Sequence, residues 1–380
     1  MNERKDYFYG IDLARFVAAV MVAFFHIGYS CWASPTSGGR HMLQKAYTIS
    51  ELAPYTWVGW TGVEIFFVIS GVVITNSAEG SSALRFLNGR ILRLYPAAWI
   101  CTTIVAITLL ANNLWHGLHP YIASMLLIPI GPWIDGQYWT LGVEIVFYAM
   151  IFVMLALGQF HRIGLFAILL TLASVITVIV IAVDPRFSIL AKGYWRLTLL
   201  NYGLYFALGI FIRLWAVGQL NRIQAGAALL CLVGVVIQTR TDALSLVAKA
   251  RFATVPVASQ WYAASLVVLI GVAAIALSAR YPAAFYRLGP KTRSTLRHLG
   301  LATYPVYLIH FSLGICITRE LVRAGFAPVM ALFTTIGVIG LLGWAIARYG
   351  EPPIRRALRI TLDRIERRAP RYRWLTGGRA

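Results

Sequence analysis

Long continuous apolar runs limit the fold of this chain more than any other feature of its sequence. A helix needs about 20 mostly apolar residues to cross a hydrocarbon core of about 30 Å. The runs are continuous, whereas the strands of a membrane β-barrel alternate in polarity over about ten residues. The sequence therefore predicts an all-α membrane protein, a bundle of about ten transmembrane helices. The candidate spans lie at 11–32, 57–77, 94–112, 138–158, 163–183, 198–216, 223–238, 260–279, 299–318 and 327–349.

The composition agrees with this interpretation. The 380 residues are 59% hydrophobic and 13% charged, with a mean hydropathy of +0.70, which is far more apolar than a soluble protein. The segments between the candidate spans are too short for a separate soluble domain. We expect one transmembrane domain at 1–350 and a basic tail at 351–380. In the tail, Ile354, Leu358 and Leu362 share one face of an amphipathic helix that would lie on anionic lipid.

The net charge of +20 is large enough to suggest a nucleic-acid partner, but membrane topology explains it better. With the N-terminus in the cytoplasm, most of the 34 Lys and Arg residues fall in inner segments, including Arg4, Lys5 and the tail. This is the bias that the positive-inside rule describes. We therefore expect both termini to be cytoplasmic and no nucleic acid to bind.

The first candidate span contains two residues that are costly inside a membrane, Arg15 and His26. They are eleven residues apart, so they fall within about 20° of each other around a helix. Along the helix axis they are separated by about 16 Å, which places Arg15 near the cytoplasmic entrance and His26 beyond the midplane. Two simpler explanations remain: Arg15 extends to the inner interface, and His26 bonds a neighbouring helix.

Two carboxylates also lie within candidate spans. Glu64 precedes Ser70 on the second span, and Glu144 lies one turn before Tyr148 on the fourth. Each carboxylate needs a cationic partner, which the arginines or a protonated His26 would supply. A purely structural ion pair explains each glutamate equally well, and Ser70 is of the small type that mediates helix packing.

A cluster of arginines precedes the third candidate span, at Arg85, Arg90 and Arg93. Such a cluster usually fixes topology, but it also suits a phosphate-bearing ligand that arrives from the cytoplasm. On the ninth span, Tyr304, Tyr307 and His310 only partly share a face, so we interpret them as packing and hydrogen-bonding residues.

The cysteines and the loop histidines show no spacing typical of a metal site or a disulfide framework. We therefore expect no metal. The residues concerned are Cys31, Cys101, Cys231, Cys316, His41, His116 and His119.

Taken in order along the chain, these motifs resemble the acyltransferase 3 family of membrane O-acyltransferases, which act on exopolysaccharide, lipopolysaccharide O-antigen and Nod factors. The resemblance covers nearly the whole chain. Two positions depart from the family pattern, because Thr303 and Gly142 stand where serine is common. The matching motifs are Arg15 and His26 at Arg-x10-His spacing, FFVISG at 66–71, RILRLYP at 90–96, WTLGVE at 139–144, YPVYLIH at 304–310 and EPPIRR at 351–356.

The resemblance implies transfer of an acyl group, usually acetyl, from cytoplasmic acyl-CoA to a hydroxyl of an envelope or exported carbohydrate. His26 would act as the general base, since an imidazole works near neutral pH, and Glu64 or Glu144 would orient it. A covalent acyl-histidine is an open variant. Arg15 would bind donor phosphate or stabilise the oxyanion.

The remaining donor-site residues follow from the same resemblance. Arg90 and Arg93 would hold the phosphates of the donor, with Ser70 nearby, while Trp139 and Tyr148 would line a tunnel for donor or acceptor. The family also implies a multi-pass protein of the bacterial inner membrane, in contact with lipids and a carbohydrate acceptor. The sequence does not set an oligomeric state.

Two other functions remain open at this stage. A secondary transporter would use the same buried charges to move a glycan precursor or another small substrate. A non-catalytic membrane scaffold would need none of them for activity. An ATP-driven pump is disfavoured because the sequence contains no phosphate-binding G-x4-GK[ST] motif.

Overall fold

The computed structural model describes residues 7–250 and 260–368. Arg4, Lys5 and residues 369–380 of the predicted tail lie outside the described residues. Within the described ranges the chain is helical and has no strand. Nine helical segments there are long and apolar enough to cross a membrane, or ten if a bent helix pair counts as one span. The predicted all-α membrane bundle is confirmed.

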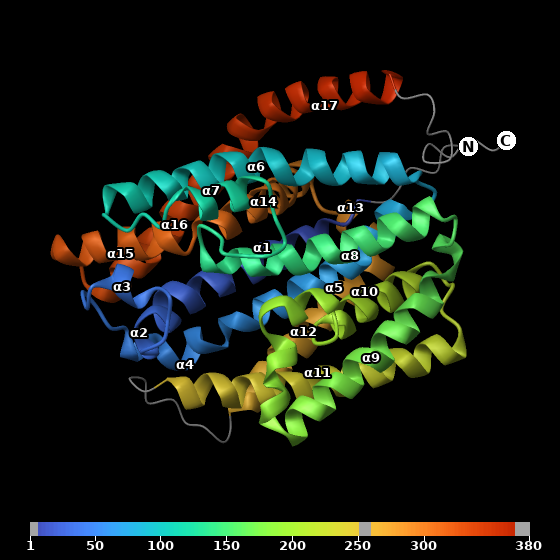
Figure 1. Cartoon of the computed structure of the whole chain (residues 1–380), viewed down its shortest axis with the longest axis horizontal. Helices are drawn as coiled ribbons and strands as arrows, with labels where there is room; N and C mark the ends of the chain where they lie inside the picture. Colours follow the sequence, from blue (N-terminus) through green and yellow to red (C-terminus); the bar gives the residue numbers. More distant parts are fainter. Residues whose placement is uncertain (1–6, 251–259, 369–380) are drawn as a thin grey trace.

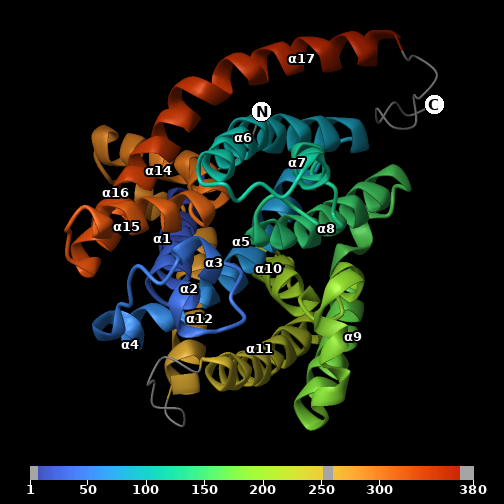
Figure 2. The same cartoon turned by 60° about the vertical axis from the view of Figure 1, so that its left-hand side comes forward.

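The longer helices run largely along one axis, whereas α17 leaves the bundle and arches across α6 (Figures 1 and 2). The short helices α2, α3 and α4 gather at the left-hand end of the bundle in Figure 1, which we call the loop end. We call the right-hand end of the bundle the tail end. The long helices are α1 (Tyr9–Phe25), α5 (Gly62–Ala78), α6 (Ala83–Ala111), α8 (Trp139–Ala156), α9 (Ile163–Val183), α10 (Gly203–Ala216), α11 (Arg222–Lys249), α12 (Gln260–Arg280), α14 (Pro290–Ile309), α15 (Ser312–Arg323), α16 (Pro328–Ala345) and α17 (Glu351–Arg368). The short ones are α2 (Cys31–Ala33), α3 (Arg40–Leu43), α4 (Ala53–Thr56), α7 (Leu118–Met125) and α13 (Ala283–Tyr286).

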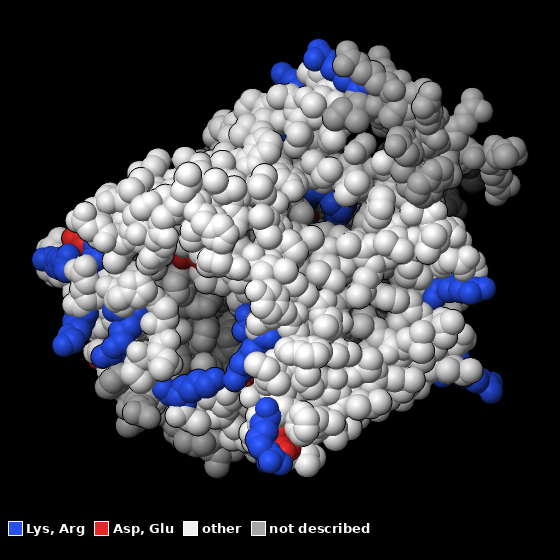
Figure 3. All heavy atoms as spheres, viewed as in Figure 1, with Lys and Arg blue, Asp and Glu red and all other residues white. Residues whose placement is uncertain are grey.

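The outer surface suits a lipid environment. Figure 3 shows that most of one face carries no charge, with Lys and Arg gathered at its edges and around a hollow. Inside, the buried apolar residues form two clusters, one centred on α5 and α10 and one on α6, α14 and the loop end. The helices that meet between these clusters enclose the cavities described below.

The third predicted span was placed too late, because α6 begins at Ala83 rather than at residue 94. The Ser82 hydroxyl accepts a hydrogen bond from the Arg85 backbone N–H at 3.3 Å, which starts the helix. Arg90 and Arg93 therefore lie within α6 and not in a loop before it. Arginine is a good helix former, so the helix continues through a segment whose hydropathy is low.

The seventh predicted span was too short, because α11 continues to Lys249 rather than ending near residue 238. Asn221 and Gln224 form a capping box at its start.

The ninth predicted span is not straight. Its two halves, α14 and α15, meet at 77°. Pro305 removes a backbone donor within α14, and Asp135 accepts hydrogen bonds from the Ser312 backbone N–H, at 3.3 Å, and from the Ser312 hydroxyl. A carboxylate at this position satisfies one of the free N–H groups that begin α15. The break places His310 at the corner between the two helices.

Close backbone contact joins α5 to α10, whose residues are nearly all buried. A Cβ atom on Gly71 would lie 2.3 Å from the Phe206 carbonyl oxygen, and one on Gly209 would lie 2.2 Å from the Val68 carbonyl oxygen. Neither backbone oxygen can move without shifting its helix, so glycine is required at both positions.

Gly71→Val is therefore expected to destabilise the bundle by about 1–3 kcal/mol or more, through overpacking against the α10 backbone. Thermal unfolding of the detergent-solubilised protein measures this. The matched control is Gly337→Val on α16, where a Cβ atom meets nothing within 4 Å. Equal melting temperatures for the two variants would contradict the close contact between α5 and α10.

Candidate functional site

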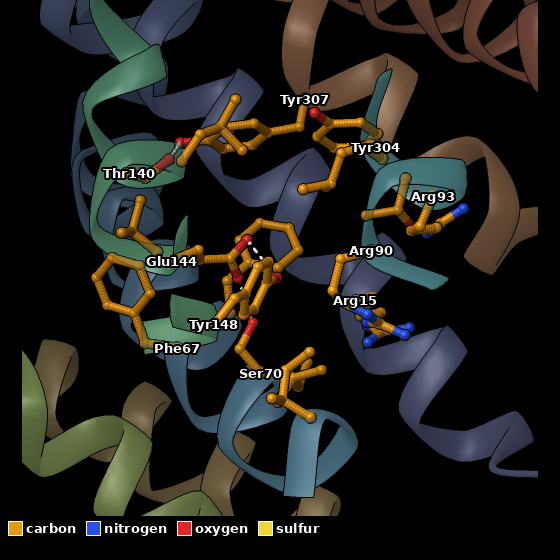
Figure 4. Close-up of a pocket in the computed structure, with 17 residues that line it drawn as sticks. Arg15, Phe67, Ser70, Arg90, Arg93, Thr140, Glu144, Tyr148, Tyr304 and Tyr307 are labelled. Carbon is orange, nitrogen blue, oxygen red and sulfur yellow. Dashed lines mark hydrogen bonds between the residues drawn. The ribbon is translucent and has the colours of Figure 1, made fainter. Parts of the chain in front are cut away.

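A cavity of about 100 Å³ lies between α1, α5, α6, α8 and α14, and we call it the central cavity. Figure 4 shows three arginine side chains grouped on one side of it. The structure thus brings together most of the residues that the sequence analysis selected from separate spans. The selected residues that line this cavity are Arg15, Ser70, Arg90, Arg93, Glu144 and Tyr148.

Glu144 is the hydrogen-bonding centre of this cavity. The Ser70 hydroxyl donates to one carboxylate oxygen, and the Tyr148 hydroxyl donates to the other at 3.0 Å. Arg15 and Arg90 are close enough to attract the carboxylate electrostatically. Ser70 therefore does more than pack a helix, since it fixes the position of a buried acid.

The arginines provide more positive charge than the cavity neutralises. Arg15 pairs with Asp12 at 3.6 Å, across one turn of α1. The Nε atom of Arg90 is buried and has no hydrogen-bond partner among the described residues. Among the described residues that line the central cavity, Glu144 is the one carboxylate, against three arginines. An arginine-rich cavity of this kind is suited to phosphate or another anion.

His26 lies at the far end of α1, where the helix widens into a π-helical turn at His26–Ser30. Such turns are frequent at functional sites. His26 Nδ1 is 2.8 Å from Nε2 of His310, and His310 Nδ1 is 2.7 Å from the carbonyl oxygen of Tyr307. The His310 side chain is fully buried.

When the His26 and His310 rings are both neutral, these two contacts determine which nitrogen of each ring carries the proton. A carbonyl oxygen only accepts, so His310 Nδ1 must donate to Tyr307, and His310 Nε2 is left as an acceptor. His26 Nδ1 then donates to His310, which leaves His26 Nε2 unprotonated. His26 Nε2 is thus left able to accept a proton, through contact with a histidine 284 residues away in the chain.

Two further cavities, of about 270 and 380 Å³, are lined by His26 and lie toward the loop end; we call them the base-side cavities. Both are also lined by Gln137 and Trp139. The Oε1 atom of Gln137 is buried and has no hydrogen-bond partner among the described residues. These cavities therefore combine a base, an aromatic ring and an uncommitted acceptor.

Titratable groups outside the spans surround the larger base-side cavity. Burial raises the pKa of Asp135 to about 6, although hydrogen bonds from Ser312 and Gln137 oppose the shift. Partial burial and the nearby His116 ring lower the pKa of His41. The centroids of these two imidazole rings are 6.1 Å apart. The lowered pKa of His41 favours its neutral form.

The central cavity and the smaller base-side cavity are neighbours. Val63 and Tyr307 line both the central cavity and the smaller base-side cavity. Arg15 and His26, which the sequence predicts on one face of a helix, thus line separate cavities that adjoin each other. The bundle therefore contains an arginine-lined cavity beside a cavity lined by His26.

The predicted roles of two residues need correction. Glu144 bonds Ser70 and Tyr148. Glu64 accepts from Thr239 at 3.4 Å, although it lines the smaller base-side cavity together with His26. The hydrogen bond that the structure describes for the His26 ring goes instead to His310. An imidazole and not a carboxylate therefore contacts His26, and the bend after Ile309 places it there.

Trp139 does not line the central cavity with the other predicted donor residues. It lines the base-side cavities, and the Arg196 guanidinium lies over its ring, 4.4 Å from the ring centroid. The sequence leaves open whether Trp139 lines a tunnel for the donor or for the acceptor. In the structure Trp139 lines the same cavities as His26.

The two departures from the family motifs have structural explanations. The Thr303 hydroxyl donates to the Leu299 carbonyl of its own helix at 3.0 Å, as a serine would. A Cβ atom on Gly142 would lie 2.4 Å from the Pro129 carbonyl oxygen, so serine does not fit there.

His310 and the α17 arginines were not selected from the sequence as site residues. His310 carried a usable signal, because it is a titratable residue within a candidate span. Its partner could not be inferred without the bend between α14 and α15.

A model of an acyltransferase domain matches residues 8–349, which is most of the chain. This chain belongs to the acyltransferase 3 family. The acyltransferase is 29% identical over 188 residues to the exopolysaccharide production protein ExoZ of Rhizobium meliloti (strain 1021). That alignment covers 45% of this chain and 56% of ExoZ, so the chain matches a little over half of its relative. No solved structure matches this chain.

Proposed function

We propose that this acyltransferase moves an acyl group, acetyl in the simplest case, from cytoplasmic acyl-CoA to a hydroxyl of an exported carbohydrate. One observation carries the proposal: an arginine-lined cavity adjoins the cavity that contains His26. Donor and acceptor would enter from opposite ends and meet between the two cavities. The related exopolysaccharide protein supports an exopolysaccharide as the acceptor.

The tail end of the bundle would face the cytoplasm, with both termini on that side. The excess of Lys and Arg in the segments assigned to this side supports the orientation. In a bacterium the protein would then lie in the inner membrane, with the base-side cavities toward the outside.

The central cavity would hold the donor. Arg90 and Arg93 would bind phosphate groups, and Ser70 and Tyr148 would line the path of the pantetheine arm, with their hydroxyls held by Glu144. Arg15 would either bind phosphate or stabilise the oxyanion that forms on the thioester carbonyl. The acyl carbon would lie where the central and base-side cavities meet.

His26 Nε2 would take the proton from the sugar hydroxyl as the oxygen attacks the thioester carbonyl. The new C–O bond forms, the C–S bond breaks, and the proton on His26 passes to the departing CoA thiolate. The base returns to its starting form, and no other reactant is needed. In the acyl-histidine variant, Nε2 itself attacks first and expels CoA as its thiolate. The sugar oxygen then displaces Nε2 from the acyl carbon, and the hydroxyl proton passes to the thiolate.

The base-side cavities have suitable groups for a carbohydrate. Trp139 presents an aromatic ring, while Gln137 Oε1 and Trp60 Nε1 are a buried acceptor and donor that have no partner among the described residues. Sugar hydroxyls both donate and accept, so they would satisfy both groups.

The test is a comparison of surface and secreted glycans from a deletion strain, with and without the restored gene. We expect one sugar to lose the mass of a single acyl group in the deletion strain and to regain it on complementation, as measured by mass spectrometry and NMR. Identical glycans together with altered uptake or efflux of a small substrate would favour the transporter instead.

A further inference from the structure

A fourth cavity, of about 480 Å³, opens at the tail end, and we call it the entrance cavity. Arg15, Arg90 and Arg93 line both this cavity and the central cavity, so the two adjoin. Its lining also includes Arg355 and Arg359 of α17. The helix that the sequence presents as a surface tail thus forms one wall of the route to the donor site.

The charge of the entrance cavity is strongly positive. Among the described residues, five arginines and one aspartate line it, which leaves a formal excess of four positive charges. The aspartate, Asp12, is already engaged by Arg15 at 3.6 Å and by the Tyr7 hydroxyl at 2.5 Å. The cavity is therefore matched to a ligand that carries several negative charges, such as a compound with more than one phosphate.

Specific contacts hold α17 in this position. Arg355 donates from Nε to the Leu92 carbonyl oxygen of α6 at 3.2 Å and also bonds the buried Glu351. Arg359 is one turn further along α17, on the same face as Arg355, and its side chain is exposed at the cavity. Arg355 thus anchors the helix, whereas Arg359 lines the cavity and makes no hydrogen bond or ion pair with any described residue.

We propose that α17 completes the donor site, with Arg359 binding the 3′-phosphate at the nucleotide end of acyl-CoA. This inference rests on the proposed function. Acyl-CoA carries phosphate at two separated places, a pyrophosphate and a 3′-phosphomonoester of about −2 charge. Arg90 and Arg93 lie deeper, toward the thioester, and bind the pyrophosphate; Arg359 lies at the rim, where the nucleotide remains.

The test compares three donors: acetyl-CoA, acetyl-dephospho-CoA, which lacks the 3′-phosphate, and S-acetylpantetheine. For Arg359→Gln we expect KM for acetyl-CoA to rise roughly tenfold, the effect of losing one charge-assisted contact, with kcat unchanged. KM for the other two donors should stay at the wild-type value. The control is Arg356→Gln, whose side chain is exposed and does not line the entrance cavity; it should match wild type with all three.

The phosphate that Arg359 meets has a second source, an anionic phospholipid headgroup. Repeating the assay in nanodiscs of phosphatidylcholine alone separates the two. If Arg359→Gln still raises KM for acetyl-CoA there, the phosphate belongs to the nucleotide. If KM rises only in anionic lipid, or rises equally for all three donors, the proposal is overturned. If wild type and Arg359→Gln prefer acetyl-CoA over acetyl-dephospho-CoA equally, this inference fails alone. If wild type uses no acyl-CoA, the proposed function fails with it.

Discussion

His26→Ala is expected to reduce acyl transfer by about 10²–10⁴-fold, the usual contribution of a general base. The substitution removes Nε2, the nitrogen that the contacts with His310 and Tyr307 leave unprotonated. Binding of acyl-CoA should be retained, because His26 does not line the arginine-containing central cavity. The measurements are transfer of labelled acetyl and equilibrium binding of acetyl-CoA to the purified variant.

The matched control for this variant is His161→Ala, because His161 is exposed at the surface and lines none of the cavities described above. It should retain wild-type transfer. Near-normal transfer by His26→Ala would remove the histidine from the chemistry and would favour a different catalytic group.

His310→Leu should lower kcat by roughly 100-fold, while KM for the donor stays the same. Leucine offers no acceptor to His26 Nδ1, so the proton is no longer fixed on that nitrogen and Nε2 is no longer held as the base. His310 is a positioning residue, since it acts through His26 and not on the substrate.

His310→Gln separates positioning from packing. The glutamine Oε1 atom reaches about as far as histidine Nε2 and accepts a hydrogen bond, so this variant should regain much of the activity that leucine loses. Thermal unfolding shows whether both variants are folded. Equal losses of activity in two folded variants would mean that the contact between the rings does not orient the base.

The helical membrane architecture could be predicted because apolar length dominates it, but helix boundaries depended on local interactions that hydropathy does not measure. The Ser82 cap starts α6 well before its apolar part. The bend at His310 depends on Asp135, which is 177 residues from Ser312 in the chain. Such a distant hydrogen bond is not visible in a single sequence.

The candidate site was partly predictable for the same reason. Charged residues within apolar spans are rare, so Arg15, His26, Glu64 and Glu144 could be selected individually. Their partners could not, because pairing depends on how the helices pack. Glu144 was expected near His26 but bonds Ser70 and Tyr148 instead. The position of α17 across the entrance cavity likewise depends on tertiary contacts, above all that of Arg355 with Leu92.

The central claim is that the acyl group passes through the bundle from one side of the membrane to the other. It is tested most directly with purified protein in sealed vesicles, with the acceptor polysaccharide inside and labelled acetyl-CoA outside. Trypsin cleavage of the arginine-rich α17 reports which molecules expose the tail end outward. We predict label on the enclosed polysaccharide in proportion to that fraction, and none with His26→Ala. The account would be contradicted if the polysaccharide were labelled only when acetyl-CoA and polysaccharide are on the same side of the membrane. It would also be contradicted if acetyl-CoA were not consumed.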